Sequence, residues 1–347
     1  MMIRFNCDYT EGACPEILER LCQTNFEQTP GYGTDDYCQQ AAQKILEACQ
    51  APQAAVHFLV GGTQANLTVI SAVLRPHQCV VCAEPGHINV HETGAIEATG
   101  HKVVGLPSPD GKLTAQQVAG YWDGHWADGS HEHIAQPKLV YISDSTELGA
   151  VYTKAELEAL SQACRQRGML LFLDGARLGY ALAAQENDLT LPDLARLCDI
   201  FYIGGTKQGA LFGEAVVICN PALQEDFRYL IKQRGGMLAK GRLLGLQFDT
   251  LFTDGLYLRL ARQADQLAVQ LRDALQELGC PMPVVSGSNQ QFAVLPDRVL
   301  AELGKDYAYS HQGQVDPEHS LVRFCTSWAT RQDQVDRLIG DLRRLCR

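Results

Sequence analysis

The stretch DIFYIGGTKQGAL (Asp199–Leu211) decides how this chain is expected to fold. Its apolar residues 200–203 predict a buried β-strand. The two glycines that follow allow a tight turn and leave Lys207 just beyond the strand end. A second apolar run, MLLFLD, ends at Asp174 and continues into Gly-Ala-Arg177. A lysine and a carboxylate therefore each follow a buried strand, at the edge of a sheet where ligands bind in open α/β folds.

Apolar strands alternate with helical stretches on both sides of this segment. Strands are predicted at 56–60, 79–83, 102–106, 138–143, 169–174, 200–204 and 216–219, with helices at 15–22, 37–48, 64–74, 88–99 and 154–167, and a surface loop at 121–136. A long helical stretch is predicted from about residue 221. Strands at 284–285, 291–295 and 321–325 are then expected to alternate with helices. The alternation predicts an α/β fold, a large domain with a mostly parallel sheet flanked by helices and a smaller α+β C-terminal domain. We expect an N-terminal arm and first helix at 1–36, the large domain at 37–250 and the small domain at 251–347.

Length and charge narrow the class of protein. A chain of 347 residues suggests two domains. The net charge of −11 and the lack of a basic block argue against nucleic acid as a partner. We find no signal peptide and no apolar run of roughly 20 residues, the length that a membrane-spanning helix needs. A cytoplasmic protein without a membrane partner is expected.

The 13 cysteines are scattered along the chain. Only Cys79 and Cys82 form a CxxC pair, and they lie in an apolar run without a second such pair, so no metal site is expected. Reduced, mostly buried thiols are the default expectation in a reducing compartment. A redox pair at Cys79 and Cys82 remains an alternative, although such motifs normally open a helix.

The residue types at the two strand ends suit pyridoxal phosphate. The amine of Lys207 would form an imine with the cofactor, and the carboxylate of Asp174 would hold the pyridine nitrogen protonated. The turn of Gly61, Gly62 and Thr63 follows a predicted strand and opens a helix, so its N–H groups and the helix dipole would bind a phosphate. Thr206 is a second candidate for a phosphate contact.

Four strings carry a resemblance to a known family: GGTQAN at 61–66, EPGHINVHETGA at 84–95, DGAR at 174–177 and GGTK at 204–207. In this order they resemble the threonine aldolase/aromatic amino acid β-eliminating lyase family. Its members are pyridoxal-phosphate enzymes of the aspartate-aminotransferase fold type, called fold type I. The resemblance runs from about Phe5 to the RFCTSW segment at 323–328, which is nearly the whole chain.

The resemblance implies further roles. His87 would stack on the cofactor ring and is a candidate base, and Arg177 would lie near both cofactor and substrate. Arg323 would bind the substrate α-carboxylate, a task that suits a planar guanidinium. Cys7 takes the place of a family serine near this carboxylate site. Tyr32 lies in a segment that resembles one completing the site of a neighbouring subunit.

Some of these positions allow other readings. From its position alone, a histidine such as His87 is more often an ordinary polar turn residue. His91 follows four residues later and would share a helix face with it, which raises the alternative of a metal pair, although the glutamate of the HExxH pattern is absent between them. Arg323 alone is equally a surface ion-pair partner.

The segment SDSTELG at 143–149 departs from the family. Aldolases of the family carry a histidine at the position of Glu147, and Asp144 stands where their glutamate would be. A carboxylate whose pKa is raised by burial can act as a base toward a β-hydroxyl group. Glu147 is therefore a fourth candidate catalytic residue, with Lys207, His87 and Asp174, or it marks a different substrate.

We expect a lyase that cleaves the Cα–Cβ bond of a threonine-type β-hydroxy amino acid to glycine and an aldehyde. The alternatives are a β-eliminating lyase, a racemase or an aminotransferase acting on another amino acid, or a binding protein that has lost the cofactor. By resemblance, the partners are a small amino acid and further copies of the chain. A homodimer or homotetramer with active sites at the subunit interface is expected.

Overall fold

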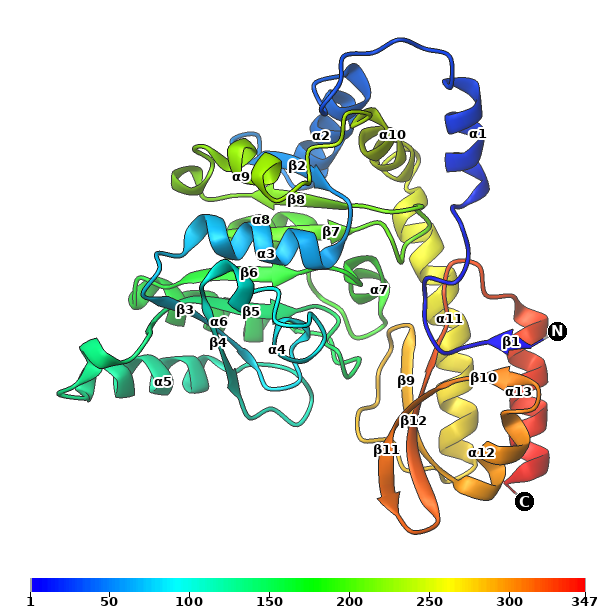
Figure 1. Ribbon diagram of the computed structural model, residues 1–347. Coiled ribbons are helices and arrows are strands. Elements are labelled where there is room, and N and C mark those ends of the chain that lie inside the picture. Colours follow the sequence, from blue (N-terminus) through cyan, green and yellow to red (C-terminus); the bar gives the residue numbers. More distant parts are fainter. Residues whose placement is uncertain (1, 347) are drawn as a thin grey trace.

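The computed structural model describes residues 2–346 and divides them between a large sheet with its helices and a smaller C-terminal unit (Figure 1). The elements run in the order β1 (Ile3–Arg4), α1 (Pro15–Gln23), α2 (Asp36–Ala48), β2 (Ala55–Leu59), α3 (Gly62–Val73), β3 (Gln78–Ala83), α4 (His87–Val90), η1 (Glu97–Thr99), β4 (Lys102–Leu106), α5 (Ala115–Ala127), η2 (His131–His133), β5 (Gln136–Ser143), α6 (Lys154–Gln166), β6 (Leu170–Asp174), α7 (Leu178–Ala183), α8 (Leu191–Leu197), β7 (Ile200–Gly204), β8 (Glu214–Ile218), η3 (Pro221–Leu223), α9 (Phe227–Gln233), α10 (Arg242–Leu251), α11 (Leu256–Glu277), β9 (Gln290–Pro296), α12 (Asp297–Leu303), β10 (Tyr307–Ala308), β11 (Ser310–Asp316), β12 (His319–Cys325) and α13 (Gln332–Leu345).

The large sheet has seven strands in the order β2-β8-β7-β6-β5-β3-β4. Neighbouring strands of this sheet pair in parallel, except that β8 runs antiparallel to both β2 and β7. Strands β3, β7 and β8 are buried along their whole length, as expected for a sheet covered by helices on both faces. The predicted mostly parallel sheet is confirmed.

The carboxyl ends of β5, β6 and β7 meet at one edge of this sheet. Ser143 at the end of β5 pairs with Asp174 at the end of β6. The turn after β6 crosses closely over β7, where the Gly204 N–H donates to the Gly175 carbonyl at 2.9 Å. A Cβ atom on Gly175 would lie 1.9 Å from the Tyr202 carbonyl oxygen, so only glycine fits there. The DGAR sequence therefore brings its carboxylate close to the strand that precedes Lys207.

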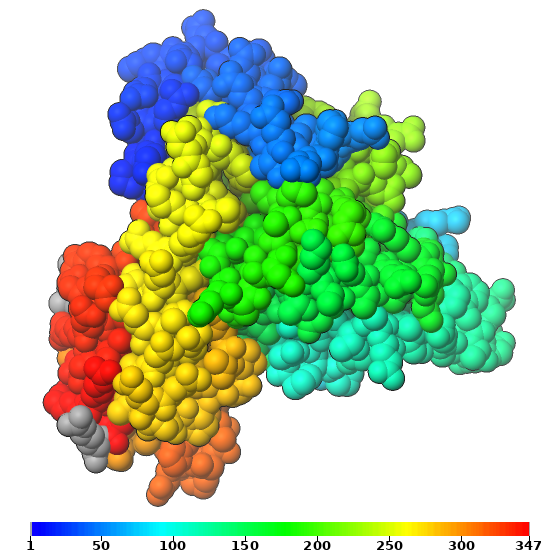
Figure 2. All heavy atoms as spheres, turned by 180° about the vertical axis from the view of Figure 1, so that it is seen from behind, coloured from blue at the N-terminus to red at the C-terminus, as the bar shows by residue number. Residues whose placement is uncertain are grey.

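The smaller unit is built on an antiparallel sheet, β11-β12-β9, that packs with α11, α12 and α13. The long helix α11 contacts both α7 of the large unit and α13. Seen from behind, it runs in yellow between the green large unit and the red C-terminal helix (Figure 2). Strand β1 pairs in parallel with β10, so the start of the chain lies against the C-terminal unit. The domain boundaries at 36/37 and 250/251 stay a prediction.

Three expected elements differ in the structure. Residues 121–127, expected in a loop, belong to α5, which starts with a capping box at Thr114 and packs the tilted rings of Trp122 and Trp126 against each other. The helix expected at 88–99 is broken, because Thr93 and Gly94 have positive φ angles of 53° and 71°. Residues 284–285 form no strand; they follow Pro281 and Pro283, which cannot donate backbone hydrogen bonds.

Cys79 and Cys82 lie inside β3 and both are free and fully buried. Burial raises the pKa of Cys79 to about 11 and that of Cys82 to about 12, so both stay thiols at neutral pH. This is the environment of structural cysteines. Among residues 2–346, no helix combines the length and the apolar character that crossing a membrane requires.

Gly175→Ala is expected to destabilise the chain, because the added methyl group would collide with the backbone of β7. Overpacking of this kind typically costs about 1–3 kcal/mol. Gly124→Ala on the exposed face of α5 is the matched control; nothing lies within 4 Å of its new methyl group. Thermal and urea unfolding of both variants would measure the difference, and equal stabilities would contradict the close crossing.

Candidate active site

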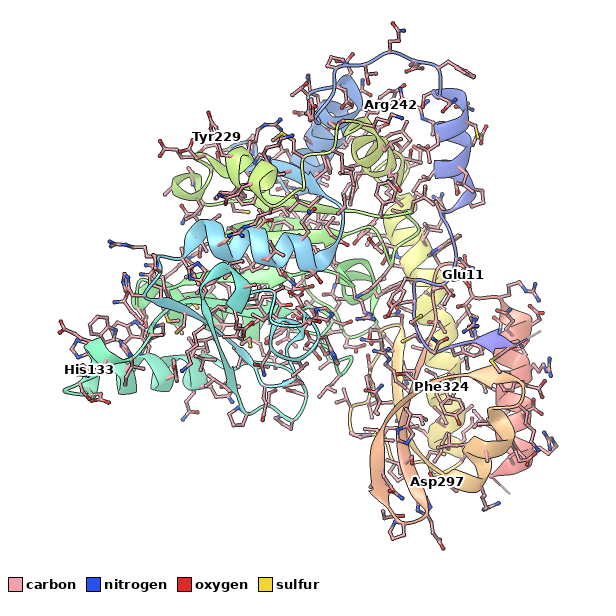
Figure 3. The ribbon with its side chains drawn as sticks, viewed as in Figure 1. Glu11, His133, Tyr229, Arg242, Asp297 and Phe324 are labelled. Atoms are coloured by element: carbon pink, nitrogen blue, oxygen red, sulfur yellow. The ribbon has the colours of Figure 1, made fainter. Side chains whose placement is uncertain are left out.

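A cavity of about 310 Å³ opens at the carboxyl edge of the large sheet. It is lined by Tyr9, Val60, Gly61, Gly62, Thr63, His87, Ser143, Ser145, Glu147, Asp174, Ala176, Arg177, Tyr202, Thr206, Lys207 and Glu214. Eight of the predicted site residues lie here together: Gly62, Thr63, His87, Glu147, Asp174, Arg177, Thr206 and Lys207. Cys7, Tyr32 and Arg323 are not among the lining residues. Figure 3 labels Phe324, the neighbour of Arg323, in the C-terminal unit.

Lys207 follows β7 in a turn that the backbone holds firmly. The N–H groups of Gly205 and Thr206 both donate to the Gly213 carbonyl, at 2.9 and 3.2 Å. Burial and the nearby Arg177 lower the pKa of the Lys207 ammonium group, although the acidic groups around it work in the opposite direction. A lowered pKa increases the fraction of neutral amine, which is the form that attacks a carbonyl carbon.

Asp174 is a buried carboxylate that accepts four hydrogen bonds. Its Oδ1 accepts from the Tyr202 hydroxyl at 2.5 Å and from the Ala176 N–H at 3.0 Å. Its Oδ2 accepts from the Tyr141 hydroxyl at 2.5 Å and from the Asn66 amide at 3.0 Å. Burial opposes ionisation, but these donors outweigh it and lower the pKa of Asp174. The group is therefore a stable anion at the floor of the cavity.

A second buried carboxylate, Glu92, holds the ring of His87. His87 Nδ1 and the Asn66 amide nitrogen lie 2.8 and 2.7 Å from Glu92 Oε1, so one amide connects Glu92 to Asp174. Burial disfavours the charged imidazole, but Glu92 and Asp174 outweigh it and raise the pKa of His87. With Nδ1 committed to Glu92, Nε2 is the ring nitrogen left for a ligand.

Glu147 lies in the cavity wall beside His87. Its Oε1 accepts from the His87 N–H at 2.8 Å and from the Ser143 hydroxyl at 2.7 Å. Burial raises the pKa of Glu147. Asp144 does not line the cavity; its Oδ1 faces the Tyr152 N–H at 3.3 Å instead. Of the two carboxylates in this segment, Glu147 is the one placed to act on a ligand.

Arg177 is neutralised by Asp8 from the N-terminal segment. Its Nε and Nη2 donate to the two carboxylate oxygens of Asp8 at 2.7 and 3.0 Å. Asn289 of the C-terminal unit donates to the same carboxylate at 2.8 Å. Burial opposes ionisation of Asp8, but the charge of Arg177 leads the effects that lower its pKa. Arg177 thus reaches the cavity as one half of a buried ion pair.

Arg323 is held at the boundary between the units. It donates from Nη1 to Gln290 Oε1 at 3.1 Å and from Nη2 to the Asn6 carbonyl at 3.2 Å, and its buried Nε has no partner among residues 2–346. Burial raises the pKa of Tyr9, a residue of the cavity wall. The charge of Arg323 partly offsets this rise. Cys7 lies between Asn6, whose carbonyl accepts a hydrogen bond from Arg323, and Asp8, which forms the ion pair with Arg177.

Tyr32 is not brought to this cavity within the chain. It lines a separate cavity of about 180 Å³ and leaves 48% of its surface exposed. The Lys232 ammonium group lies 4.9 Å from the centre of its ring. A role of Tyr32 in substrate binding therefore requires a second copy of the chain.

The turn that the sequence predicts as the phosphate site has backbone N–H groups that are free to donate. Gly61, Gly62 and Thr63 line the cavity at the start of α3, where no side chain caps the helix. A Cβ on Gly62 would approach the Tyr202 hydroxyl to 3.0 Å, so the backbone lies close to the donor that holds Asp174. Unsatisfied N–H groups at such a helix start suit a phosphate. Lysine, carboxylate, histidine and helix start together fit pyridoxal phosphate.

The His87 and His91 rings lie 5.7 Å apart. His91 directly follows α4, which ends at Val90. Among the residues that the structure describes, no group of three or more His, Cys, Asp or Glu side chains is arranged to hold a metal ion.

Known proteins share this architecture. A solved structure of Leishmania major threonine aldolase is 46% identical and covers 99% of this chain and 100% of its own, with a TM-score of 0.97. A low specificity L-threonine aldolase of a Pseudomonas species is 30% identical over 98% of this chain and 97% of its own length. Serine palmitoyltransferase of Sphingomonas wittichii is 13% identical, covers 99% of this chain and 87% of its own, and has a TM-score of 0.73, a likeness of fold alone.

The chain thus has the fold of the type I pyridoxal-phosphate enzymes, with its cavity at the carboxyl edge of the large sheet. It belongs to the beta-eliminating lyase family, whose profile matches residues 5–297. The resemblance found in the sequence is confirmed, and the chain is a lyase of this family.

Sequence reasoning missed several residues of the site: Asp8, Asn66, Glu92, Tyr141, Tyr202 and Glu214. Two signals were available for the tyrosines. Each lies two residues before a strand end, so it shares a face with that end. A tyrosine in a buried strand also needs a partner for its hydroxyl group. Asp8 carries no such signal, because its partner Arg177 is distant in the sequence.

Glu92→Gln is expected to lower the pKa of His87, because the neutral amide removes the charge that favours the protonated ring. NMR titration of the imidazole would measure the shift, with the exposed Glu97→Gln as control. A folded-state pKa raised above the ordinary 6.5 stabilises the fold below pH 6.5, and this stabilisation disappears as pH rises through the pKa of His87. The stability lost in Glu92→Gln should therefore be largest in acid; an unchanged His87 titration would refute the pairing.

Proposed function

We propose that this protein is a pyridoxal-phosphate-dependent aldolase that cleaves the Cα–Cβ bond of threonine-type β-hydroxy amino acids to glycine and an aldehyde. The observation that carries the proposal is the meeting of Lys207, Asp174 and His87 in one cavity. The chain is also similar along its full length to enzymes named threonine aldolases. We further propose that it acts in the cytoplasm.

The residues of the cavity would divide the binding of the cofactor among them. Lys207 would hold the aldehyde carbon, Asp174 the ring nitrogen and His87 one face of the ring. The start of α3, with Gly62 and Thr63, would hold the phosphate, and the Thr206 hydroxyl, which donates to Glu214, would border it. When bound, pyridoxal phosphate supplies a ring that accepts the electron pair left at Cα by bond cleavage. Asp174 contributes by keeping a negative charge beside the ring nitrogen.

The substrate carboxylate would lie against Arg323, whose Nε has no partner among residues 2–346. Arg177 and Cys7 border the same region, and Asp8 fixes the guanidinium group of Arg177. This leaves the side chain of the substrate toward Glu147 and His87. Glu147 would take the proton of the β-hydroxyl group, since a carboxylate whose pKa is raised by burial is a stronger base.

We infer that the active form is a homodimer or homotetramer in which Tyr32 reaches the cavity of a neighbour. Large apolar side chains are exposed near this segment: Phe26 is 93% exposed and Tyr229 is 77% exposed. Figure 3 shows Tyr229, a residue of α9, at the outer surface. Aromatic side chains are enriched at protein–protein interfaces.

Lys207→Ala is expected to remove the covalently held cofactor and the activity, because no other primary amine of residues 2–346 lines the cavity. Borohydride reduction followed by mass spectrometry would show a cofactor adduct in the wild type and none in the variant. The visible absorbance of the bound cofactor should disappear as well. Lys305→Ala, at an exposed turn residue that follows α12, is the control and should retain both. A reducible adduct that survives in Lys207→Ala would reject the assignment.

Glu147→Gln is expected to slow cleavage of L-threonine, L-allo-threonine and phenylserine, since the amide cannot take up the hydroxyl proton. General-base catalysis is typically worth about 10²–10⁴ in rate. Exchange of the α-proton of glycine needs no such base and should be spared. The amide oxygen can still accept from the His87 N–H and Ser143, so the loop should keep its position.

The exposed Glu84→Gln serves as the control for this comparison. An equal fall in cleavage and exchange would mean that Glu147 binds the substrate or supports the fold. Unchanged cleavage would leave His87 or a water molecule as the base. Absence of cleavage by the wild type would reject the aldolase reading in favour of β-elimination, which the family assignment also allows.

A further inference from the structure

Glu214 is a buried carboxyl group in the cavity wall that the proposed reaction does not use. It begins β8, where it pairs with Leu59 of β2 on one side and with Gly204 of β7 on the other. Strand β2 continues into the 61–63 turn, and β7 continues into Lys207. Glu214 therefore lies between the helix start proposed for the phosphate and the lysine proposed for the aldehyde carbon.

One oxygen of this carboxyl group has no partner. Oε1 accepts from the Thr206 hydroxyl at 3.0 Å, and the Thr206 oxygen in turn accepts from the Gly213 N–H at 3.0 Å. Oε2 is buried and has no hydrogen-bond partner among residues 2–346. The residue lines the cavity, and only 3% of its surface is exposed. Buried polar atoms normally have partners. A ligand group at this end of the cavity would supply the missing contact.

The charge balance indicates what form Glu214 takes beside a phosphate. The cationic side chains that line the cavity are His87, Arg177 and Lys207. Asp8 neutralises Arg177, Glu92 pairs with His87, and Lys207 would be bonded to the cofactor. None of them is left to separate a phosphate from an ionised carboxylate, and two such anions in a buried site repel each other strongly. A protonated carboxyl group instead donates a hydrogen bond.

We propose that Glu214 is protonated in the cofactor-bound protein and donates a hydrogen bond from Oε2 to the phosphate group. At alkaline pH, cofactor binding then takes up a proton from the solvent at this residue, and the affinity falls. The inference rests on the proposed function only through the position of the phosphate at the start of α3.

The surroundings of Glu214 favour the neutral acid. Burial raises its pKa to about 8, against the charge of Lys207 and the hydrogen bond from Thr206, while Asp174 acts in the same direction as burial. The other titratable groups that face it are Tyr202 and Tyr257, whose pKa values are raised by burial so that both stay neutral. An arriving phosphate adds a further negative charge.

Pyridoxamine 5′-phosphate tests the proposal because it carries the phosphate but has no aldehyde for Lys207. A carboxyl group with a pKa of about 8 is about nine-tenths protonated at pH 7 and about one-tenth at pH 9. Wild-type affinity should therefore fall about tenfold more than that of Glu214→Gln between these pH values. Calorimetry in buffers of different ionisation enthalpy should show close to one more proton taken up by the wild type at pH 9.

Glu84→Gln is the control, because it removes an exposed carboxyl group that does not line the cavity. It should keep the pH dependence of the wild type. Pyridoxamine without the phosphate, bound to the wild type, should lack the Glu214-dependent fall. If Glu214→Gln does not fold, the proposal is tested on the wild type alone, by comparing the pH dependence of its affinity for the two probes.

Equal pH dependence and equal proton uptake in the wild type and Glu214→Gln would overturn the proposal. Tighter binding by the variant at pH 7 would also overturn it, because it would mean that an ionised Glu214 repels the phosphate. Neither probe is cleaved, so these results do not depend on which amino acid the enzyme accepts. Failure of the wild type to bind either probe would instead reject the cofactor site and, with it, the proposed function.

Discussion

A carboxylate buried in the middle of a sheet stays ionised only if hydrogen-bond donors surround it, and the active site of this protein is built around that constraint. Asp174 ends β6 and receives donors from β5, β7, α3 and its own turn. Each donor depends on the register of the strand or helix that carries it. A shift of β7 by one residue would turn Tyr202 to the opposite face and leave an unpaired buried charge.

The same requirement extends to the parts of the chain that close the site. Arg177, three residues after Asp174, is itself a buried charge and is satisfied by Asp8. Asp8 also accepts from Asn289 of the C-terminal unit. Arg323 donates to the side chain of Gln290 at 3.1 Å, and Gln290 donates to the Thr146 carbonyl, next to Glu147, at 3.3 Å. Polar contacts therefore connect the N-terminal segment, the C-terminal unit and the cavity wall.

The acidic side chains of the cavity differ in behaviour because their environments differ. Burial disfavours the charge on all of them, but Asp174 has four donors and its pKa is lowered, whereas Glu147 and Glu214 have fewer and their pKa values are raised. One kind of functional group, the carboxyl group, can thereby supply a permanent anion, a base and a neutral acid in one cavity. The proposals for Glu147 and Glu214 depend on this separation.

The sequence alone determined the mostly parallel sheet, the positions of Lys207 and Asp174 at strand ends and the family, because these follow from local periodicity and short contiguous strings. It did not determine α5, because Asp123, Gly124 and His125 within it are typical of a loop, whereas the segment forms a helix through capping and ring packing. Nor did it determine the partners of the charged groups. Asp8 and Arg177, or Glu214 and the 61–63 turn, are far apart in sequence and meet only when the strands pair, so tertiary structure alone decides which carboxyl groups are paired and which face a ligand.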